Sequence, residues 1–387
     1  MSRIPLSVPS IKGNEWKYLK ECLDTEWISS AGKYVDLFEK NISEYTGSKY
    51  AIACVNGTSA IQISLHLAGV CPGDEVIVPT LTFIAPVNAI AYNGAIPIFM
   101  DADKYYNIDI EKTIHFINKE TYFKNGFSYN KSSKNKISAI VPVHVWGNGC
   151  LLDELVAICN ERNIQIVEDA SESLGTSYLE GTYSDNHTGT IGKFGCISFN
   201  GNKIISTGGG GMILTDDSML AEKAKYLTTQ AKDDEVKYIH NSIGYNFRLT
   251  NIQAALGVAQ LESLPEFLIK KKKIFRYYSE GIKEIQGLLI ADVPSYCQNN
   301  HWLNLLQIKK DIYIDDRNHI FSKFEKNNIQ TRPVWFLNHV QLPYKNNQNY
   351  KIENAINLIE NSLCLPSSTN LKTNDMDRVI QQLILKK

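Results

Sequence analysis

Three short segments carry residues whose types and spacing could do chemistry together. The first, Asn56-Gly57-Thr58-Ser59, follows a predicted strand and opens a predicted helix. Free backbone N–H groups and hydroxyls at the start of a helix form a phosphate site. A purely structural role, in which Thr58 or Ser59 only caps the helix, is the alternative for this segment.

The second segment supplies a carboxylate. Asp169 follows a predicted buried strand, Ile164 to Glu168, at the edge where open α/β sheets place their ligands. A buried charge is costly without a partner, so this carboxylate needs a metal, a ribose hydroxyl or a protonated heterocycle. The ribose is disfavoured because no GxGxxG precedes a helix in the chain. A capping aspartate without a function is the other alternative.

The third segment supplies an amine. Lys203 comes just after a predicted strand, Cys196 to Asn200, and before the glycine run 208–211. A partly desolvated lysine can act as nucleophile and base. The glycines do not complete a GxxxxGK[ST] phosphate loop. A lone lysine in this place is more often a surface charge, so its assignment depends on the other two segments.

Together the segments match what pyridoxal 5′-phosphate (PLP) requires. Gly57, Thr58 and Ser59 would anchor the phosphate, Asp169 would keep the pyridine nitrogen protonated, and Lys203 would be the Schiff-base lysine. We therefore predict Lys203 and Asp169 as the catalytic residues, with PLP as cofactor and no metal. Phe83 is predicted to cover the ring face, the alternative being an ordinary core phenylalanine.

The elements around these segments alternate between apolar strands and amphipathic helices, which predicts an α/β fold with a mostly parallel sheet. The uncharged stretch Val76 to Met100 contains three prolines, so we expect two buried strands flanking a short helix rather than a membrane span. The predicted strands are Tyr50–Val55, Glu75–Val78, Ile96–Met100, Ile137–Val143, Ile164–Glu168, Cys196–Asn200 and Gly211–Thr215.

The pattern changes at about residue 250. A long helix is predicted over Asn251–Ile282, with the run Lys270 to Lys273 on a solvated face, followed by strands at Trp302–Ile308 and Ile329–Val334. We predict a large domain with an N-terminal arm at residues 1–250 and a smaller α+β domain at residues 251–387. The polar stretches Lys124–Lys136 and Lys345–Lys351 are predicted surface loops.

Composition sets limits on partners and location. The 387 residues are 43% hydrophobic and carry a net charge of −1, which disfavours nucleic-acid and membrane-surface binding. The eight cysteines show no paired spacing, so we expect reduced, structural thiols. The N-terminus lacks the apolar core of a signal peptide, and the protein is expected to be soluble and cytoplasmic.

At these residues the sequence resembles the DegT/DnrJ/StrS family of PLP-dependent sugar aminotransferases over nearly its whole length. Matching segments are Phe38-Glu39, Asn56 to Ala60, Gly73 to Ile77, Thr82-Phe83, Glu168-Asp169-Ala170, Ser198-Phe199, Asn202-Lys203, Thr207-Gly208 and Gly244 to Arg248. The resemblance implies the type I, aspartate aminotransferase-like fold, with Ser198 among the cofactor contacts. It also implies a homodimer with shared active sites, in which Asn246, on the loop Gln230 to Arg248, contacts the partner's cofactor phosphate.

Two positions depart from the family pattern. Glu172 stands where the family usually has glutamine or histidine near the cofactor's phenolic oxygen, and Gly209 stands where glutamate is common. With glutamate at position 172, the sequence resembles a subgroup of the family that makes 4-amino sugars for legionaminic-acid-type nonulosonates and other acetylated amino sugars. Relatives with histidine in place of the lysine are sugar dehydratases, so Lys203 favours transamination.

The resemblance implies transfer of an amino group from L-glutamate to a nucleotide-linked 4-keto-6-deoxy sugar, expected in its 2-acetamido form, for surface polysaccharide such as lipopolysaccharide or for nonulosonates. His187, His301 and Arg332 are candidate contacts of the sugar, diphosphate or donor carboxylate. The alternatives are a 3-keto-sugar aminotransferase, a non-catalytic regulator that binds PLP and nucleotide-sugar, and a PLP enzyme of another type. The last would need a mobile cysteine such as Cys297.

Overall fold

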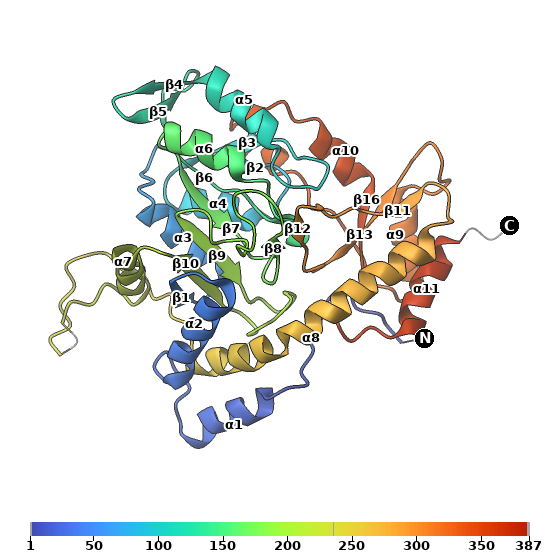
Figure 1. Cartoon of the computed structure of the whole chain (residues 1–387), viewed down its shortest axis with the longest axis horizontal. Coiled ribbons are helices and arrows are strands. Elements are labelled where there is room, and N and C mark those ends of the chain that lie inside the picture. Colours follow the sequence, from blue (N-terminus) through green and yellow to red (C-terminus); the bar gives the residue numbers. More distant parts are fainter. Residues whose placement is uncertain (1, 235, 385–387) are drawn as a thin grey trace.

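The computed structural model describes residues 2–234 and 236–384 of the chain, so the predicted ranges 1–250 and 251–387 extend beyond it at residues 1, 235 and 385–387. A large sheet forms its centre (Figure 1). Pairing is parallel from β9 to β15 and antiparallel at β1 and β10. In spatial order the strands are β1 (Tyr50–Cys54), β10 (Gly211–Thr215), β9 (Phe194–Ser198), β7 (Gln165–Asp169), β6 (Lys136–Ile140), β2 (Glu75–Pro79), β3 (Ile96–Met100) and β15 (Asn349–Tyr350).

Helices cover both faces of this sheet, which explains why its strands are apolar on both sides. Val76 and Val78 pack in one cluster with residues of α3 and α4, whereas Ile77 packs in another with residues of α5 and α6. The predicted pair of strands around a short helix is confirmed by β2, α4 and β3. The helices of this part are α1 (Glu15–Asp24), α2 (Lys33–Thr46), α3 (Gly57–Leu67), α4 (Ile84–Tyr92), α5 (Ile110–Glu120), α6 (Asp153–Glu161) and α7 (Ser218–Thr228).

The helix α8 (Asn251–Ile282) begins at Thr250, whose side chain forms a capping box with Gln253, and spans the bounds expected from the sequence. It runs under the large sheet and reaches a second, antiparallel sheet (Figure 1). A separate apolar cluster fills that end of the molecule. The elements there are β11 (Leu288–Ile290), β13 (Asn304–Ile308), β14 (Arg332–Pro333), β16 (Ser362–Leu365), α9 (Arg317–Lys326), α10 (Asn354–Glu360) and α11 (Thr373–Leu383).

Segments near each end of the chain pack against the part of the fold that the rest of their own half does not form. Ile4 pairs with Ile329 and packs in the cluster of the second sheet, while β15 adds to the large sheet next to β3. The division at residue 250 therefore stays a prediction. Between β8 (Ser177–Tyr178) and β12 (Cys297–Gln298) a short pairing also joins the two halves.

Two predictions about polar segments are wrong in part. Residues 124–136 contain β5 (Phe127–Asn130), which pairs with β4 (Thr121–Lys124) and with β6, because alternating aromatic residues give the hairpin a packing face. Residues 345–351 contain β15. In the lysine run, Lys271 is buried, since its place on α8 faces the loops at Trp302 and Ser367.

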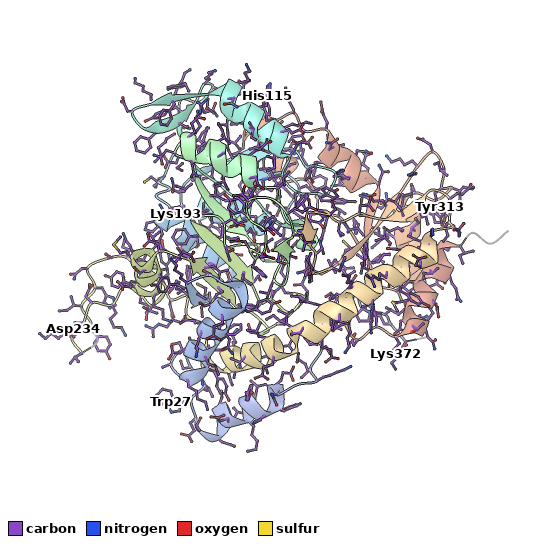
Figure 2. The ribbon with its side chains drawn as sticks, in the orientation of Figure 1. Trp27, His115, Lys193, Asp234, Tyr313 and Lys372 are labelled. Carbon is purple, nitrogen blue, oxygen red and sulfur yellow. The ribbon has the colours of Figure 1, made fainter. Side chains whose placement is uncertain are left out.

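The segment after α7 extends away from the body, with Asp234 near its outer end (Figure 2). Within residues 2–234 and 236–384, no helix has both the length and the apolar character that crossing a bilayer requires.

Candidate active site

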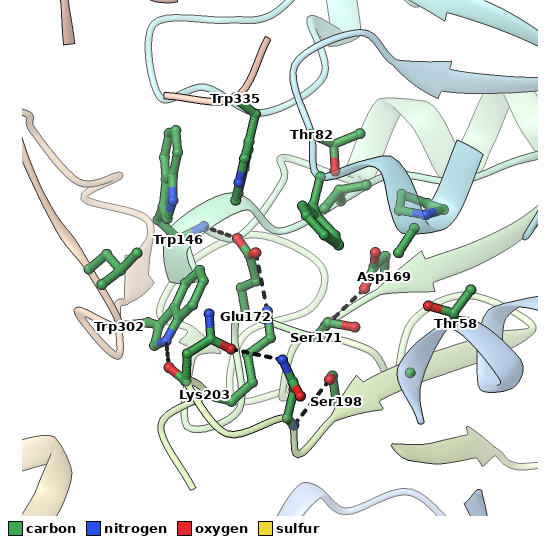
Figure 3. A pocket seen from close by; sticks show the side chains of 18 of the residues that line it. Thr58, Thr82, Trp146, Asp169, Ser171, Glu172, Ser198, Lys203, Trp302 and Trp335 are labelled. Carbon is green, nitrogen blue, oxygen red and sulfur yellow. Dashed lines mark hydrogen bonds and ion pairs between the residues drawn. The ribbon is translucent and has the colours of Figure 1, made fainter. Parts of the chain in front are cut away.

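A pocket of about 450 Å³ opens at the carboxyl edge of the large sheet and brings together residues from both halves of the chain (Figure 3). Its lining includes the buried Asp169, the half-buried Lys203 and the exposed Phe83 and Arg332, all of which were predicted as site residues. The turn after β1, the ends of β7 and β9, and the loops at Trp302 and Trp335 all reach it. The structure therefore places the three predicted chemical segments in one cavity.

The start of α3 forms one side of this pocket. Asn56 caps the helix by accepting a hydrogen bond from the Ser59 backbone N–H at 2.8 Å, and Ser59 is not part of the pocket lining. The N–H groups of Gly57 and Thr58 have no acceptor among the residues that the structure describes. A Cβ on Gly57 would lie 2.9 Å from that of Ser198, so glycine allows the helix start to approach β9. Free N–H groups beside a hydroxyl suit a phosphate.

Asp169 ends β7, and its carboxylate is buried beneath the pocket. Burial raises its pKa above the usual range, and a hydrogen bond from the Ser171 N–H at 3.0 Å opposes that rise. Among the described residues, only Ser171 donates to this carboxylate. A buried carboxylate with so few donors favours a cationic ligand group.

The strand end that carries Asp169 is held from behind. The Glu168 carboxylate accepts hydrogen bonds from His144 Nε2 at 2.9 Å and from the backbone N–H groups of Gly189, Ile191 and Gly192. Burial works to raise the pKa of Glu168, but His144 and the N–H groups outweigh it, so the pKa is lowered. This network fixes the loop behind β7 and the direction of Asp169.

Lys203 points into the pocket between a carboxylate and an indole. Its Nζ lies 3.2 Å from Glu172 Oε1 and 4.2 Å from the centre of the Trp302 ring. The other oxygen of Glu172 accepts a hydrogen bond from the backbone N–H of Trp146 at 2.9 Å. Burial raises the pKa of Glu172, and the charge of Lys203 acts against this. Trp302 is fixed in turn, because its Nε1 donates to the Asn202 carbonyl oxygen at 2.7 Å.

These residues fit PLP on the evidence of their own geometry. Among the residues that the structure describes, the cradle at Gly57 offers N–H groups without an acceptor, the buried Asp169 forms no ion pair, and Lys203 offers an amine on the same cavity. Phe83 is 54% exposed and lines the pocket, so it is free to cover a ring instead of packing in the core. Within the described residues there is no group of three or more side chains that could hold a metal.

The three candidate substrate contacts are placed differently. Arg332 is exposed and lines the pocket. Both ring nitrogens of His187 are occupied by backbone groups of Gly175 and Thr188, and burial lowers its pKa to about 4. His301 stacks on Phe275 outside the lining, and burial lowers its pKa to about 4. Neither histidine lines the pocket, so we do not propose either as a substrate contact.

Asn246 also lies outside the lining of the pocket. It is exposed and forms a bridge with Thr229 at the base of the projecting segment. The apolar side chains Val236 and Ile243 of this segment are 87% and 89% exposed. Such exposure of large apolar groups is typical of a surface that meets a protein partner.

Sequence reasoning missed the aromatic residues of the pocket. Trp146, Trp302 and Trp335 all line it, and they come from three distant parts of the chain. A tryptophan in an apolar stretch looks like a core residue, so only the fold brings these three together. Arg332, which the sequence offered as a candidate substrate contact, lies three residues before Trp335 and was the sequence signal for this part of the cavity.

Comparisons with known proteins assign the chain to a family. The model of the DegT/DnrJ/EryC1/StrS aminotransferase family matches residues 9–384. The chain is 35% identical over 388 residues to GDP-perosamine synthase of Caulobacter vibrioides, covering 99% of this chain and 98% of that protein. It is 34% identical over 389 residues to EpsN of Bacillus subtilis, described as a candidate pyridoxal phosphate-dependent aminotransferase, covering 99% and 95%.

Among solved structures, DesI determined in the presence of its TDP-sugar product has a TM-score of 0.87 at 25% identity. The match covers 99% of this chain and 92% of that one. The likeness confirms the fold class expected from the sequence, an α/β fold of the PLP-dependent transferases with a mostly parallel sheet.

Proposed function

Since this chain belongs to the DegT/DnrJ/EryC1/StrS aminotransferase family, we propose that it transfers an amino group from L-glutamate to C4 of a nucleotide-linked 4-keto-6-deoxy hexose. The chain is a PLP-dependent sugar aminotransferase of this family. The observation that carries the proposal is the convergence of Lys203, Asp169 and the Gly57 cradle on one cavity.

Lys203 does the proton work in this proposal. Its Nζ takes the α-proton of L-glutamate in the first half of the reaction, which ends with release of 2-oxoglutarate. In the second half it places a proton on C4 of the sugar as that carbon receives the amine. Glu172 Oε1, 3.2 Å from Nζ, orients the amine, and this carboxyl would lie near the phenolic oxygen of the bound cofactor.

The other residues hold the cofactor. When bound, PLP supplies an electron sink for the charge that develops when the proton leaves carbon. Asp169 would keep a proton on the ring nitrogen; its burial and the absence of an ion pair to it among the described residues support this role. The N–H groups of Gly57 and Thr58 and the hydroxyl of Ser198 would bind the phosphate, and Phe83 would cover the ring face; all four residues line the pocket. A contact from Ser59 stays a prediction.

We also propose a homodimer in which Asn246 of the partner subunit completes the phosphate site. The exposed apolar side chains of Val236 and Ile243, and the position of Asn246 outside the described lining of the pocket, support this arrangement.

The sugar and its nucleotide belong to the proposal as well. Similarity to proteins named GDP-perosamine synthase, which make a 4-amino sugar, supports C4 amination and makes a GDP-linked hexose the first substrate to test. The UDP-linked 2-acetamido form, for legionaminic-acid-type sugars, is the second. Surface polysaccharide, including lipopolysaccharide, is the proposed destination of the product, and the cytoplasm is the proposed location of the enzyme.

The test is a two-part reaction. The PLP-loaded protein is mixed with L-glutamate, and the visible absorbance of the bound cofactor is followed. The glutamate-treated protein is then given GDP-, UDP- and dTDP-linked 4-keto-6-deoxy sugars, and products are identified by mass spectrometry and NMR. We expect loss of the absorbance and a product aminated at C4. Amination at C3 would favour the 3-keto alternative, and an absorbance unchanged by glutamate would favour the non-catalytic regulator.

A further inference from the structure

Two tryptophans form a flat surface in the pocket that none of the roles above uses. The rings of Trp146 and Trp335 lie nearly parallel, with centres 4.8 Å apart and an angle of 17°. Trp146 is buried and Trp335 is half-buried, and both line the pocket. Figure 3 shows them side by side next to Glu172. We call this pair the aromatic wall, and we infer that its outer member, Trp335, stacks against the hexose ring of the substrate.

The backing of this wall is rigid. Trp146 has a positive φ of 52°, a conformation that a bulky residue adopts only when its surroundings impose it. Its backbone N–H donates to Glu172 Oε2, and its ring meets Tyr106 edge-on at 4.9 Å. The Tyr106 hydroxyl is bonded to that of Ser362 at 2.7 Å. With its backbone bonded to Glu172 and its ring packed against Tyr106, Trp146 gives Trp335 a fixed support, so binding costs little ordering of the wall.

The position of the wall indicates which part of the substrate it meets. Glu172 links Lys203 to the aromatic wall. One of its carboxylate oxygens lies 3.2 Å from Lys203 Nζ, and the other accepts a hydrogen bond from the backbone N–H of Trp146. The reacting carbon must lie at Lys203. The nucleobase is separated from that carbon by the hexose, two phosphates and a ribose, so only the hexose can lie beside Lys203 and against Trp335 together.

The chemistry of the cavity indicates the kind of hexose. Asp169, Glu172 and Lys203 line the pocket near the reacting carbon, and the charged Arg332 lines it near Trp335. The ring of Trp335 itself faces Phe83, with ring centres 6.4 Å apart. An indole face attracts the C–H face of a pyranose, but it offers no acceptor for a hydroxyl donor. A hydroxyl at C6 placed against the wall would lose its hydrogen bonds to water without replacement. The aromatic wall therefore favours a 6-deoxy hexose.

This inference rests on the proposed function, but its test is a binding measurement that needs no turnover. Isothermal titration of the PLP-loaded protein would use GDP, GDP-D-rhamnose and GDP-D-mannose, because these two D-sugars differ only at C6. The variants are Trp335→Ala and Trp335→Phe. Trp16→Phe, which changes an exposed tryptophan on α1 outside the pocket lining, is the control.

We expect Trp335→Ala to bind GDP-rhamnose roughly 10-fold more weakly, as for the loss of one aromatic stacking contact. Trp335→Phe should keep most of the affinity, and Trp16→Phe all of it. Affinity for GDP should not change, and the preference of the wild type for GDP-rhamnose over GDP-mannose should shrink in Trp335→Ala.

Three results would overturn the inference: equal weakening of GDP and GDP-rhamnose, which indicates stacking of the base; unchanged binding of GDP-rhamnose; or no preference of the wild type between the two sugars. The glutamate step keeps this separate from the proposed function. A wild type that does not react with glutamate fails the proposed function, whereas Trp335→Ala that reacts normally with glutamate but binds all ligands as the wild type fails only the aromatic wall.

Discussion

Lys271 is a buried lysine on α8 whose charge has a predictable effect on stability. Its side chain is 2% exposed, and its Nζ donates to the carbonyl oxygens of Trp302 at 2.7 Å and Ser367 at 2.5 Å. It forms no ion pair with any residue that the structure describes. Burial lowers its pKa from 10.5 to about 7. A neutral amine keeps two N–H donors, so both carbonyls stay bonded after the proton leaves.

The sign and size of the effect follow from proton binding. Between pH 7 and 10 the unfolded chain holds about one more proton at this lysine than the folded chain does, so the free energy of unfolding rises with pH. The slope is about 1.4 kcal/mol per pH unit, which gives about 2 kcal/mol between pH 7.5 and 9. Lys271→Met removes this contribution and keeps an apolar chain of similar length.

The measurement is urea unfolding of the PLP-loaded protein at pH 7.5 and 9, for wild type, Lys271→Met and the exposed neighbour Lys272→Met. The difference in unfolding free energy, wild type minus Lys271→Met, should rise by about 2 kcal/mol across this range. The same difference for Lys272→Met should stay near zero, because that side chain is exposed. A Lys271→Met difference that does not change with pH would refute the reasoning, since it would mean that the buried amine keeps its charge.

Three further predictions concern packing, pH and assembly. Gly257→Ala should destabilise the fold by about 1–3 kcal/mol, measured by urea unfolding, because the new Cβ would lie 2.6 Å from the buried Phe38 ring; unchanged stability would contradict it. Burial raises the pKa of Glu172, so wild-type activity should change with pH above the usual range of a carboxyl, and Glu172→Gln should lose that dependence; identical pH profiles would count against a role beside Lys203. Mixing inactive Asn246→Ala and Lys203→Ala proteins should restore part of the activity through mixed dimers, since one site then has both intact residues; no recovery from subunits shown to exchange would speak against a shared site.

The sequence was sufficient where one segment carries its own signal. The apolar strands, the Thr250-capped helix α8 and the turn at Gly57 all depend on residues adjacent in the chain, and the structure has them near their predicted bounds. Burial could not be read in the same way. Lys271 stands among lysines that face water, and only the packing of α8 against loops about 30 and 100 residues further on buries it.

The pocket shows the same limit. Asp169 and Lys203 follow strand ends, so the edge of a parallel sheet brings them together in a predictable way. Trp146 and Trp335 meet only because a left-handed turn and the short strand β14 place them in parallel. His187 looked like a candidate by its residue type, yet local backbone groups take both of its ring nitrogens.

The covalent attachment of the cofactor to Lys203 is the most direct test of the central claim. The PLP-loaded protein is reduced with borohydride, digested and analysed by mass spectrometry, with Lys203→Ala treated in the same way. We predict one added cofactor per chain in the wild type, located on the peptide that contains Lys203, and none in Lys203→Ala of unchanged fold. Label on another lysine, or equal labelling of Lys203→Ala, would contradict the account.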